Sequence, residues 1–222
     1  MLPSYTHIVN PKLKHIYFSF DDEGQLVVKS PKISHASIEK LLLKKAAWIT
    51  KSKEKYLEKK GKTLRFCGKE RLYYLGKAYP IELVEHEKKE TQLLFDGSTF
   101  IVHYHTFHPS LFQKHIDNFY KKTAKETILP LVEKWAHIMQ VEFSAVHFRK
   151  TKRQWGSCSS SNRLSFNTMM MKLPLSVIEY IVVHELTHIT HKHHQKAFWD
   201  AVHHYLPTYK TEIAELKKYT TY

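Results

Sequence analysis

The sequence predicts an α+β fold, in which a strand-rich N-terminal region with a basic helix precedes a helical region with a small sheet. Two observations support this prediction. Before His108, short segments alternate apolar and polar residues, which is typical of half-buried strands. From Pro109 onward, apolar residues recur every three or four positions, which indicates amphipathic helices. We therefore divide the chain into an N-terminal region, 1–108, and a C-terminal region, 109–222.

The N-terminal region is expected to begin with a β-hairpin. Segments 14–20 and 25–29 alternate apolar and polar residues, and the residues between them, Asp22 to Gly24, are typical of a turn. A basic helix should follow from Lys40 to about Gly61, because apolar residues recur at helical spacing among its lysines. Further short strands are predicted between turn residues, at 64–67, 72–75, 79–85, 92–95 and 100–104.

The C-terminal region should contain a long helix over 111–139, which Pro130 is expected to kink or break. Short strands are predicted at 146–148 and 164–167, on either side of a loop around Gly156. A second helix should begin near Pro174, because apolar residues from Val177 onward recur at helical spacing. One or two terminal helices should follow.

The second predicted helix carries the sequence H-E-x-x-H, from His184 to His188. On a helix, positions i and i+4 lie on one face, so both histidines can bind one metal ion. Glu185 then lies beside the metal, where a general base for an attacking water is needed. Because the chain has 17 histidines, the bare motif is weaker than in a histidine-poor protein, but its helical context supports it. The motif predicts zinc-assisted hydrolysis.

A catalytic zinc site requires three protein ligands and an open position. His191 continues the helical face but lies about 10.5 Å along the axis from His184, so the two converge poorly on one ion. A ligand beyond a chain reversal is better placed, and a new helix is expected to start near Gln195. This favours His194 in the turn, with His193 as the alternative and His191 as a weaker one.

Four segments together resemble one known family. They are Arg153-Gln154-Trp155-Gly156-Ser157-Cys158-Ser159, Leu164-Ser165-Phe166-Asn167, Val182-Val183-His184-Glu185-Leu186-Thr187-His188, and His194 with Phe198-Trp199. This pattern is similar to that of the YgjP-like metal-dependent hydrolases, a zincin-like family grouped with the WLM and SprT-like zinc peptidases. Two positions depart from the family pattern: His193 stands where the family usually has Asn, and Gln195 where it usually has Ser.

The resemblance implies a zincin-like catalytic region with a Zn²⁺ ion held by His184, His188 and His194, and a polypeptide substrate. In zinc peptidases of this kind, an edge strand near the active-site helix can hold an extended substrate, and segment 163–168 is our candidate for that strand. Basic residues cluster around Trp155, and arginine beside glycine and aromatic residues can bind phosphate or a developing oxyanion. The residues that we expect to contact the substrate are Arg153, Trp155, Arg163 and Asn167.

Composition indicates the cellular compartment of the protein and the class of its binding partners. The net charge is +14, with 19 Lys and Arg against 12 Asp and Glu before Pro109 and a similar excess after it. This predicts attraction to anions such as nucleic acid, nucleotides or acidic proteins without choosing among them. Only two cysteines occur, Cys67 and Cys158, which fits a reducing cytoplasm. No apolar leader follows Met1, and the apolar runs are too short to span a membrane.

The sequence is also compatible with two other functions. A nucleotide phosphoanhydride hydrolase (a pyrophosphatase) would use the same metal centre, with the arginines holding phosphates. A nucleic-acid-associated peptidase would use the basic surface to reach its target. The lysines of the predicted basic helix also have a simpler explanation, because they can cover its solvated face.

Overall fold

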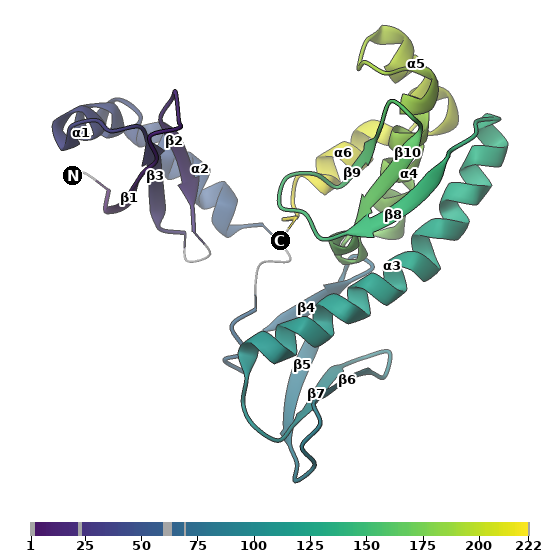
Figure 1. Cartoon of the computed structure of the whole chain (residues 1–222), viewed down its shortest axis with the longest axis horizontal. Helices are drawn as coiled ribbons and strands as arrows, with labels where there is room; N and C mark the ends of the chain where they lie inside the picture. Colours follow the sequence, from purple (N-terminus) through teal and green to yellow (C-terminus); the bar gives the residue numbers. More distant parts are fainter. Residues whose placement is uncertain (1–2, 22–23, 60–63, 69, 222) are drawn as a thin grey trace. The chain divides into compact units, whose positions relative to one another are not determined.

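The computed structural model describes residues 3–21, 24–59, 64–68 and 70–221 (Figure 1). Helices and three small sheets alternate along these residues, so the predicted α+β class is confirmed. The chain forms two compact units, Met1–Lys59 and Lys60–Tyr222. Among the described helices, none is both long and apolar enough to cross a membrane.

The first unit is a three-stranded sheet with two helices. Strands β1 (Tyr5–Val9), β3 (Leu26–Ser30) and β2 (Tyr17–Phe20) lie in that order, with β1 parallel and β2 antiparallel to β3. The predicted hairpin is therefore confirmed, although its turn residues 22 and 23 fall outside the described residues. Strand β1 had not been predicted.

The basic segment forms two helices instead of one. Helix α1 spans His35–Lys44 and α2 spans Ala46–Leu57, and Lys45 between them leaves helical geometry with φ −105° and ψ 10°. The break lets both helices pack on one face of the sheet, because Ile38 and Leu42 of α1 and Ile49 of α2 share a core with β3. The end predicted near Gly61 lies outside the described residues.

The second unit begins with a four-stranded sheet in the order β4 (Arg71–Tyr74), β5 (Lys77–Glu85), β7 (Phe100–Tyr104), β6 (Gln92–Phe95). These strands match four of the five predicted ones, whereas 64–67 is not a strand. Phe100 and Val102 of β7 share a core with Phe112 of the following helix. The boundary predicted between 108 and 109 therefore lies inside this unit.

Helix α3 spans Pro109–Met139 without a break. Pro130 does not break the helix, and it lies on the exposed side, where the carbonyl group that loses its hydrogen bond can face water. The buried side continues past it, since Ile128 and Val132 are both fully buried in the core of the unit.

A second small sheet and the remaining helices follow α3. Strands β8 (Ala145–Arg149), β10 (Arg163–Asn167) and β9 (Gly156–Cys158) lie in that order, with β10 in the middle. The prediction that 163–168 is an edge strand is therefore wrong, because β8 and β9 occupy its two sides. Strand β9 had been predicted as a loop. The remaining helices are the 3₁₀ turn η1 (Thr168–Lys172), α4 (Leu175–Thr190), α5 (Lys196–Tyr205) and α6 (Tyr209–Leu216).

The β4–β5 turn holds the start of α4 in place. Leu75 N donates to Met171 O at 2.8 Å, and Gly76 N donates to Lys172 O at 3.2 Å. Gly76 also packs directly against Pro174, the residue that precedes α4. These contacts tie the first sheet of this unit to the helix that carries the H-E-x-x-H motif.

Gly76→Ala should therefore destabilise the protein. Gly76 has φ +82°, and an added Cβ would lie 2.8 Å from Pro174 Cγ and 2.9 Å from its Cα. Backbone strain of this kind costs about 1–3 kcal/mol, and the steric clash adds to it. Gly97→Ala is the matched control, because Gly97 has φ +96° with nothing within 4 Å. Urea unfolding should show a larger loss of free energy for the Gly76 variant. Equal losses would mean that the turn does not support α4.

Candidate metal centre

Helix α4 places two histidines of the motif one turn apart. Apolar residues surround the helix, with Val182, Val183 and Leu186 fully buried. His184 and His188 are only partly buried, and their ring centroids are 5.0 Å apart. As the helical spacing predicted, both imidazoles lie on the same side of a helix whose other sides are largely buried.

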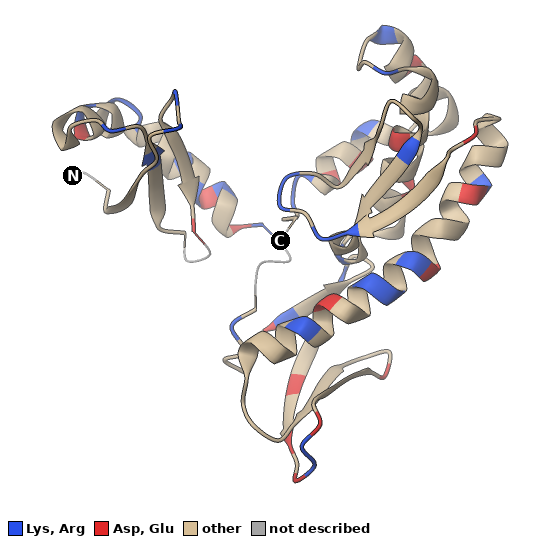
Figure 2. Ribbon diagram, in the orientation of Figure 1, with Lys and Arg blue, Asp and Glu red and all other residues tan. Residues whose placement is uncertain are grey.

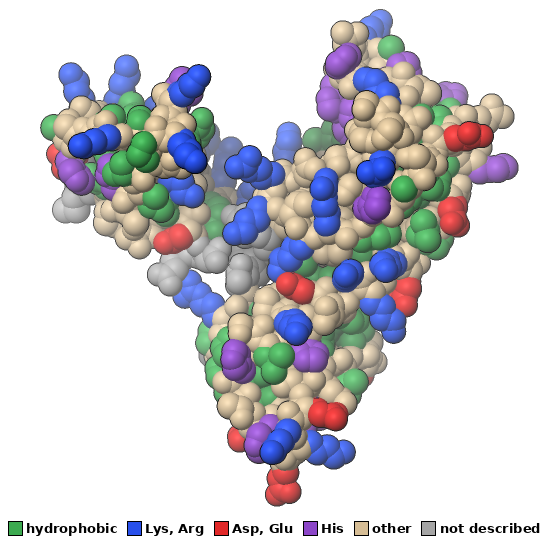
Figure 3. Space-filling model, viewed as in Figure 1, with side chains coloured by type: hydrophobic (Ala, Val, Ile, Leu, Met, Phe, Trp, Pro, Cys, Tyr) green, Lys and Arg blue, Asp and Glu red, His purple; other side chains and the backbone are tan. Residues whose placement is uncertain are grey.

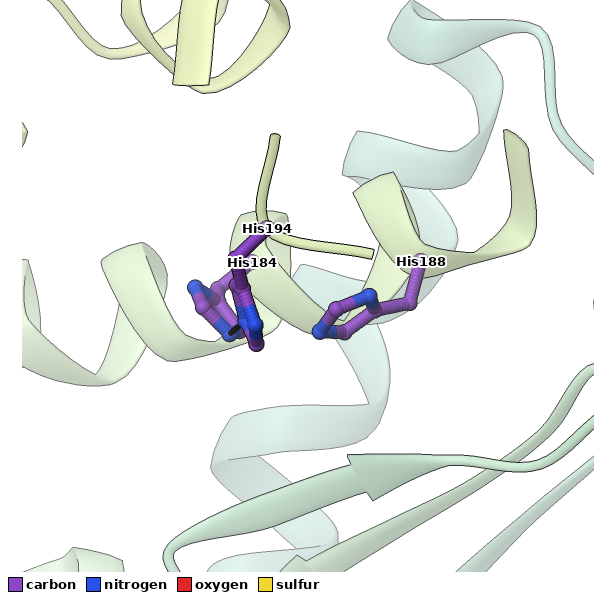
Figure 4. Close-up of side chains that lie close together, drawn as sticks. All are labelled: His184, His188 and His194. Carbon is purple, nitrogen blue, oxygen red and sulfur yellow. Dashed lines mark hydrogen bonds between the residues drawn. The ribbon is translucent and has the colours of Figure 1, made fainter. Parts of the chain in front are cut away.

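The third histidine comes from the turn between α4 and α5. The chain leaves helical geometry at His191 and enters α5 at Lys196, so His194 lies in the reversal. Its Nε2 is 3.0 Å from the Nε2 of His184. One ring nitrogen from each of the three histidines lies within 4.8 Å of the others (Figure 4).

Phe198 of α5 supports this arrangement. Its buried ring lies 4.9 Å from the ring of His184 and 4.6 Å from those of His188 and His194, measured between centroids. One apolar side chain thus contacts all three imidazoles and limits how far each can turn. Trp199 stacks against His194 with the ring planes 27° apart.

These side chains fit a zinc ion. Three imidazoles leave one position open in a tetrahedral site, which is the donor set of a catalytic zinc. Zinc–nitrogen bonds of about 2.0–2.1 Å place neighbouring ligand nitrogens roughly 3.3 Å apart, close to the 3.0 Å between His184 and His194. Among the described residues, the cluster includes neither His193 nor His191.

Hydrogen bonds orient the rings. His188 donates from Nδ1 to the carbonyl oxygen of His191 at 3.1 Å, which leaves its Nε2 lone pair for a metal. The hydroxyl of Tyr180 lies 3.4 Å from Nδ1 of His184. Burial, with His188 and His194 nearby, lowers the pKa of His184 to about 3. The ring is therefore neutral at pH 7, which is the form that can bind a metal.

Glu185 lines the same pocket as the histidines and lies next to Gly156 of strand β9. Its side chain is buried, and burial raises its pKa to about 8. The backbone of Gly156 approaches it so closely that a Cβ there would lie 2.7 Å from Cγ and Oε1 of Glu185. Only glycine allows this contact between the strand and the carboxyl group.

A pocket of about 350 Å³ opens over these groups. It is lined by Gly156, Ser157, Cys158, His184, Glu185, His188, Lys192 and His194. Ser157 and Lys192 had not been predicted as site residues, although Ser157 belongs to the motif around Gly156. Cys158 is half-buried, and burial raises the pKa of its thiol.

The four residues expected to contact substrate lie in different places. Asn167 is buried and donates to the carbonyl oxygens of Thr151 and Gln154, so its amide holds the preceding loop. This corrects its predicted role, because its hydrogen-bonding groups are already used. Trp155 packs against the core, and the exposed Arg153 does not line the pocket of the histidines. Arg163 lines a neighbouring groove that shares two residues with that pocket.

Comparison with known proteins identifies a family. A family model described as YgjP-like, metallopeptidase domain, matches residues 14–219. Two solved metallopeptidase zymogens are similar over part of the chain. Abylysin of Pyrococcus abyssi is 21% identical, with 40% of this chain and 90% of that one covered and a TM-score of 0.38. Jannalysin of Methanocaldococcus jannaschii is 22% identical, with 40% and 91% covered and a TM-score of 0.36. No curated protein matches the chain.

Replacing any one of His184, His188 or His194 by Ala should weaken zinc binding more than about 100-fold, since losing even an outer hydrogen-bond partner costs 10–100-fold. Competition against a chromophoric chelator measures this affinity. His193→Ala is the matched control, because His193 is exposed, adjacent to His194 and outside the cluster. Loss of zinc affinity in the His193 variant, with the His194 variant unaffected, would assign the third ligand to His193.

Proposed function

The chain belongs to the YgjP-like metallopeptidase family, and on that basis we propose that it is a zinc peptidase whose His184, His188 and His194 hold the metal. The observation that carries the proposal is the convergence of three ring nitrogens within 4.8 Å beside a buried carboxyl group. Zinc fits the donor set, because imidazole suits this metal. When bound, it lowers the pKa of water and polarises a carbonyl oxygen.

Glu185 is the proposed general base. It follows His184 directly on α4 and lines the same pocket. A cation held by the three histidines would lower the raised pKa of this carboxyl group, because a nearby positive charge favours the ionised form, and the carboxylate can then take a proton from the attacking water. The same oxygen can then deliver that proton to the leaving amine of a cleaved peptide bond. Gly156 presses against the side chain and limits its freedom, which keeps the carboxylate positioned for both transfers.

Strand β9 is the proposed site for the substrate backbone. It lies at the edge of its sheet, pairs on one side with β10, and contributes Gly156, Ser157 and Cys158 to the pocket. An extended peptide can pair with a free strand edge through main-chain hydrogen bonds. We therefore propose that the substrate pairs with β9 rather than with β10, for which the sequence had predicted this role. Strand β9 is also the strand next to Glu185.

Glu185→Gln should lower kcat by about 10²–10⁴-fold, because the amide cannot accept a proton. Zinc content should stay unchanged, since the three histidines are untouched. The assay follows cleavage of an unfolded protein and a peptide library by zinc-loaded protein. Glu133→Gln is the control, because this exposed residue of α3 lies away from the pocket. Full activity in the Glu185 variant would rule out its role as the base.

The first unit has a surface suited to nucleic acid, which we propose as an additional partner. Helices α1 and α2 cover one face of its sheet, and no other described element of this unit covers the opposite face. We define the open sheet face by the row Ile8, Lys29 and Tyr17, which the strand register places side by side. Ile8 is 43% and Tyr17 50% exposed. An exposed aromatic ring beside a lysine is a common feature of single-strand binding surfaces.

Charge in this unit is unevenly distributed. Residues 3–20 and 24–38 contain no Asp or Glu, and exposed Lys12, Lys14 and Lys32 lie near the end of the sheet where β2 starts and β3 finishes. Asp21 lies at the opposite end, after β2. Figures 2 and 3 show lysines around this unit, with few acidic residues among them. The open sheet face therefore adjoins a basic end of the sheet, as a phosphate backbone requires.

Lys29→Ala should weaken binding of a labelled oligothymidylate and make the slope of log K against log salt less steep by about 1. Tyr17→Ala should weaken binding of the oligonucleotide but not of inorganic polyphosphate, because only a base can stack on the ring. Fluorescence anisotropy measures both. Lys51→Ala on α2 is the control, since it removes one exposed lysine from the first unit but outside the open sheet face. Equal losses for Lys51 and Lys29 would indicate non-specific attraction.

A further inference from the structure

A second groove joins the metal pocket along strand β9. It has a volume of about 560 Å³ and is lined by His147, Phe148, Arg149, Ser157, Cys158, Ser159, Arg163 and Ser165. Ser157 and Cys158 line both the groove and the pocket of the histidines. A ligand that follows the edge of β9 therefore passes from one to the other without leaving the protein surface.

The strand register places most of the groove on the face of the sheet that points away from the core. Ser165 of β10 lies between His147 of β8 and Ser157 of β9. The residues on either side of Ser165, Leu164 and Phe166, point the other way and are fully buried. Arg149 follows His147 by two residues on the same face of β8, and Arg163 starts β10 on that face.

The groove is positively charged and has no acidic residue in its lining. All of its lining residues belong to the segment from Phe143 to Ile178, which contains six Lys and Arg but no Asp or Glu (Figure 2). Within the described residues, neither Arg149 nor Arg163 has a carboxylate partner. Arg149 instead contacts Ser157, with Nη2 3.4 Å from the serine Oγ.

Two further groups in the lining can hydrogen-bond to a ligand. Ser165 Oγ is buried and has no hydrogen-bond partner among the described residues. The exposed imidazole of His147 lies beside it across the strand pair. Since buried polar groups are nearly always paired, an unpaired hydroxyl in this lining is consistent with a ligand or water that completes it.

An extended substrate paired with β9 would reach both cavities, because successive side chains of a strand point to opposite faces. One set of alternate side chains would point into the metal pocket. The other set would point to the outer face of the sheet, where Arg149 and Arg163 lie. Guanidinium groups favour carboxylates as partners because two parallel hydrogen bonds can form.

We propose that this groove is a specificity subsite for acidic side chains of the polypeptide substrate, with Arg149 and Arg163 as the residues that bind them. The proposal rests on the proposed peptidase function and adds a substrate class to it. It predicts that Glu or Asp is favoured at alternate positions of the substrate, and that the positions between them show no such preference.

The experiment uses matched peptides that carry Glu or Gln at one position at a time. Zinc-loaded parent protein should show kcat/KM about tenfold or more higher for Glu at outward positions, as expected for a charged hydrogen-bonded pair. In Arg149→Gln, Arg163→Gln and the double variant, this ratio should fall toward 1 while cleavage of the Gln peptides is kept. The variants Arg149→Lys and Arg163→Lys should keep only part of the preference for Glu, because lysine cannot bind a carboxylate through two parallel hydrogen bonds.

Lys152→Ala is the control, because it removes a charge from the same acid-free segment without altering the groove lining. The proposal would be overturned if the parent protein showed no preference for Glu. It would also be overturned if the arginine variants cleaved the Glu and Gln peptides with equally reduced kcat/KM. Release of phosphate from nucleoside triphosphates that depends on both arginines would overturn it as well, since the groove would then bind phosphate.

Binding to the Glu185→Gln protein separates this proposal from the peptidase function. Isothermal titration of the Glu and Gln peptides reports the preference of the groove without turnover. Absence of cleavage in the parent protein, with tighter binding of Glu peptides retained, would reject the peptidase function alone. Cleavage with equal binding of both peptides would reject the acidic subsite alone.

Discussion

Burial of helix α4 is the constraint on which the rest of the site depends. The helix packs against α3, β9, α5 and α6, and most of its apolar side chains are fully buried. Each such side chain contributes about 1.5–3 kcal/mol, so the helix has little freedom to rotate or slide. The side with His184 and His188 opens into a pocket. The positions of both histidines are therefore set by apolar packing that has no part in the chemistry.

Burying the polar groups of the site costs free energy, and the apolar packing of α4 offsets that cost. Burial shifts the pKa of Glu185 upward and that of His184 downward, because a charge is disfavoured at both positions. Phe198 restricts the motion of the rings that it contacts, and Gly156 restricts that of the carboxyl group. Such restriction supports our proposal of a preorganised metal centre. The same strand that carries Gly156 also joins the pocket to the basic groove, so one short element links the proposed base, the substrate backbone and the proposed subsite.

Local features of the sequence predicted most of the site, whereas pairing between distant segments was not predictable. His184 and His188 follow from the helical spacing of the motif, and His194 from the need for a chain reversal. Strand β9 was missed because three residues, one of them glycine, show no alternation. The edge strand was misassigned because a parallel partner, β8, lies on the other side of β10, and no local pattern reveals such pairing. Asn167 was misassigned because only the folded structure shows that its amide is used by the loop. The sequence placed the domain boundary between residues 108 and 109, whereas the structure places it between 59 and 60. The strand pattern of β7 and the helical pattern of α3 differ in sequence, but the two elements share one core.

The most direct test of the account is crystallographic anomalous scattering at the zinc absorption edge from zinc-loaded protein. We expect one strong peak, bonded to Nε2 of His184, to Nε2 of His188 and to a ring nitrogen of His194. The carboxylate of Glu185 should lie nearby without binding the ion. A peak away from these histidines, or one bonded to Glu185 or His193, would contradict the proposed metal centre.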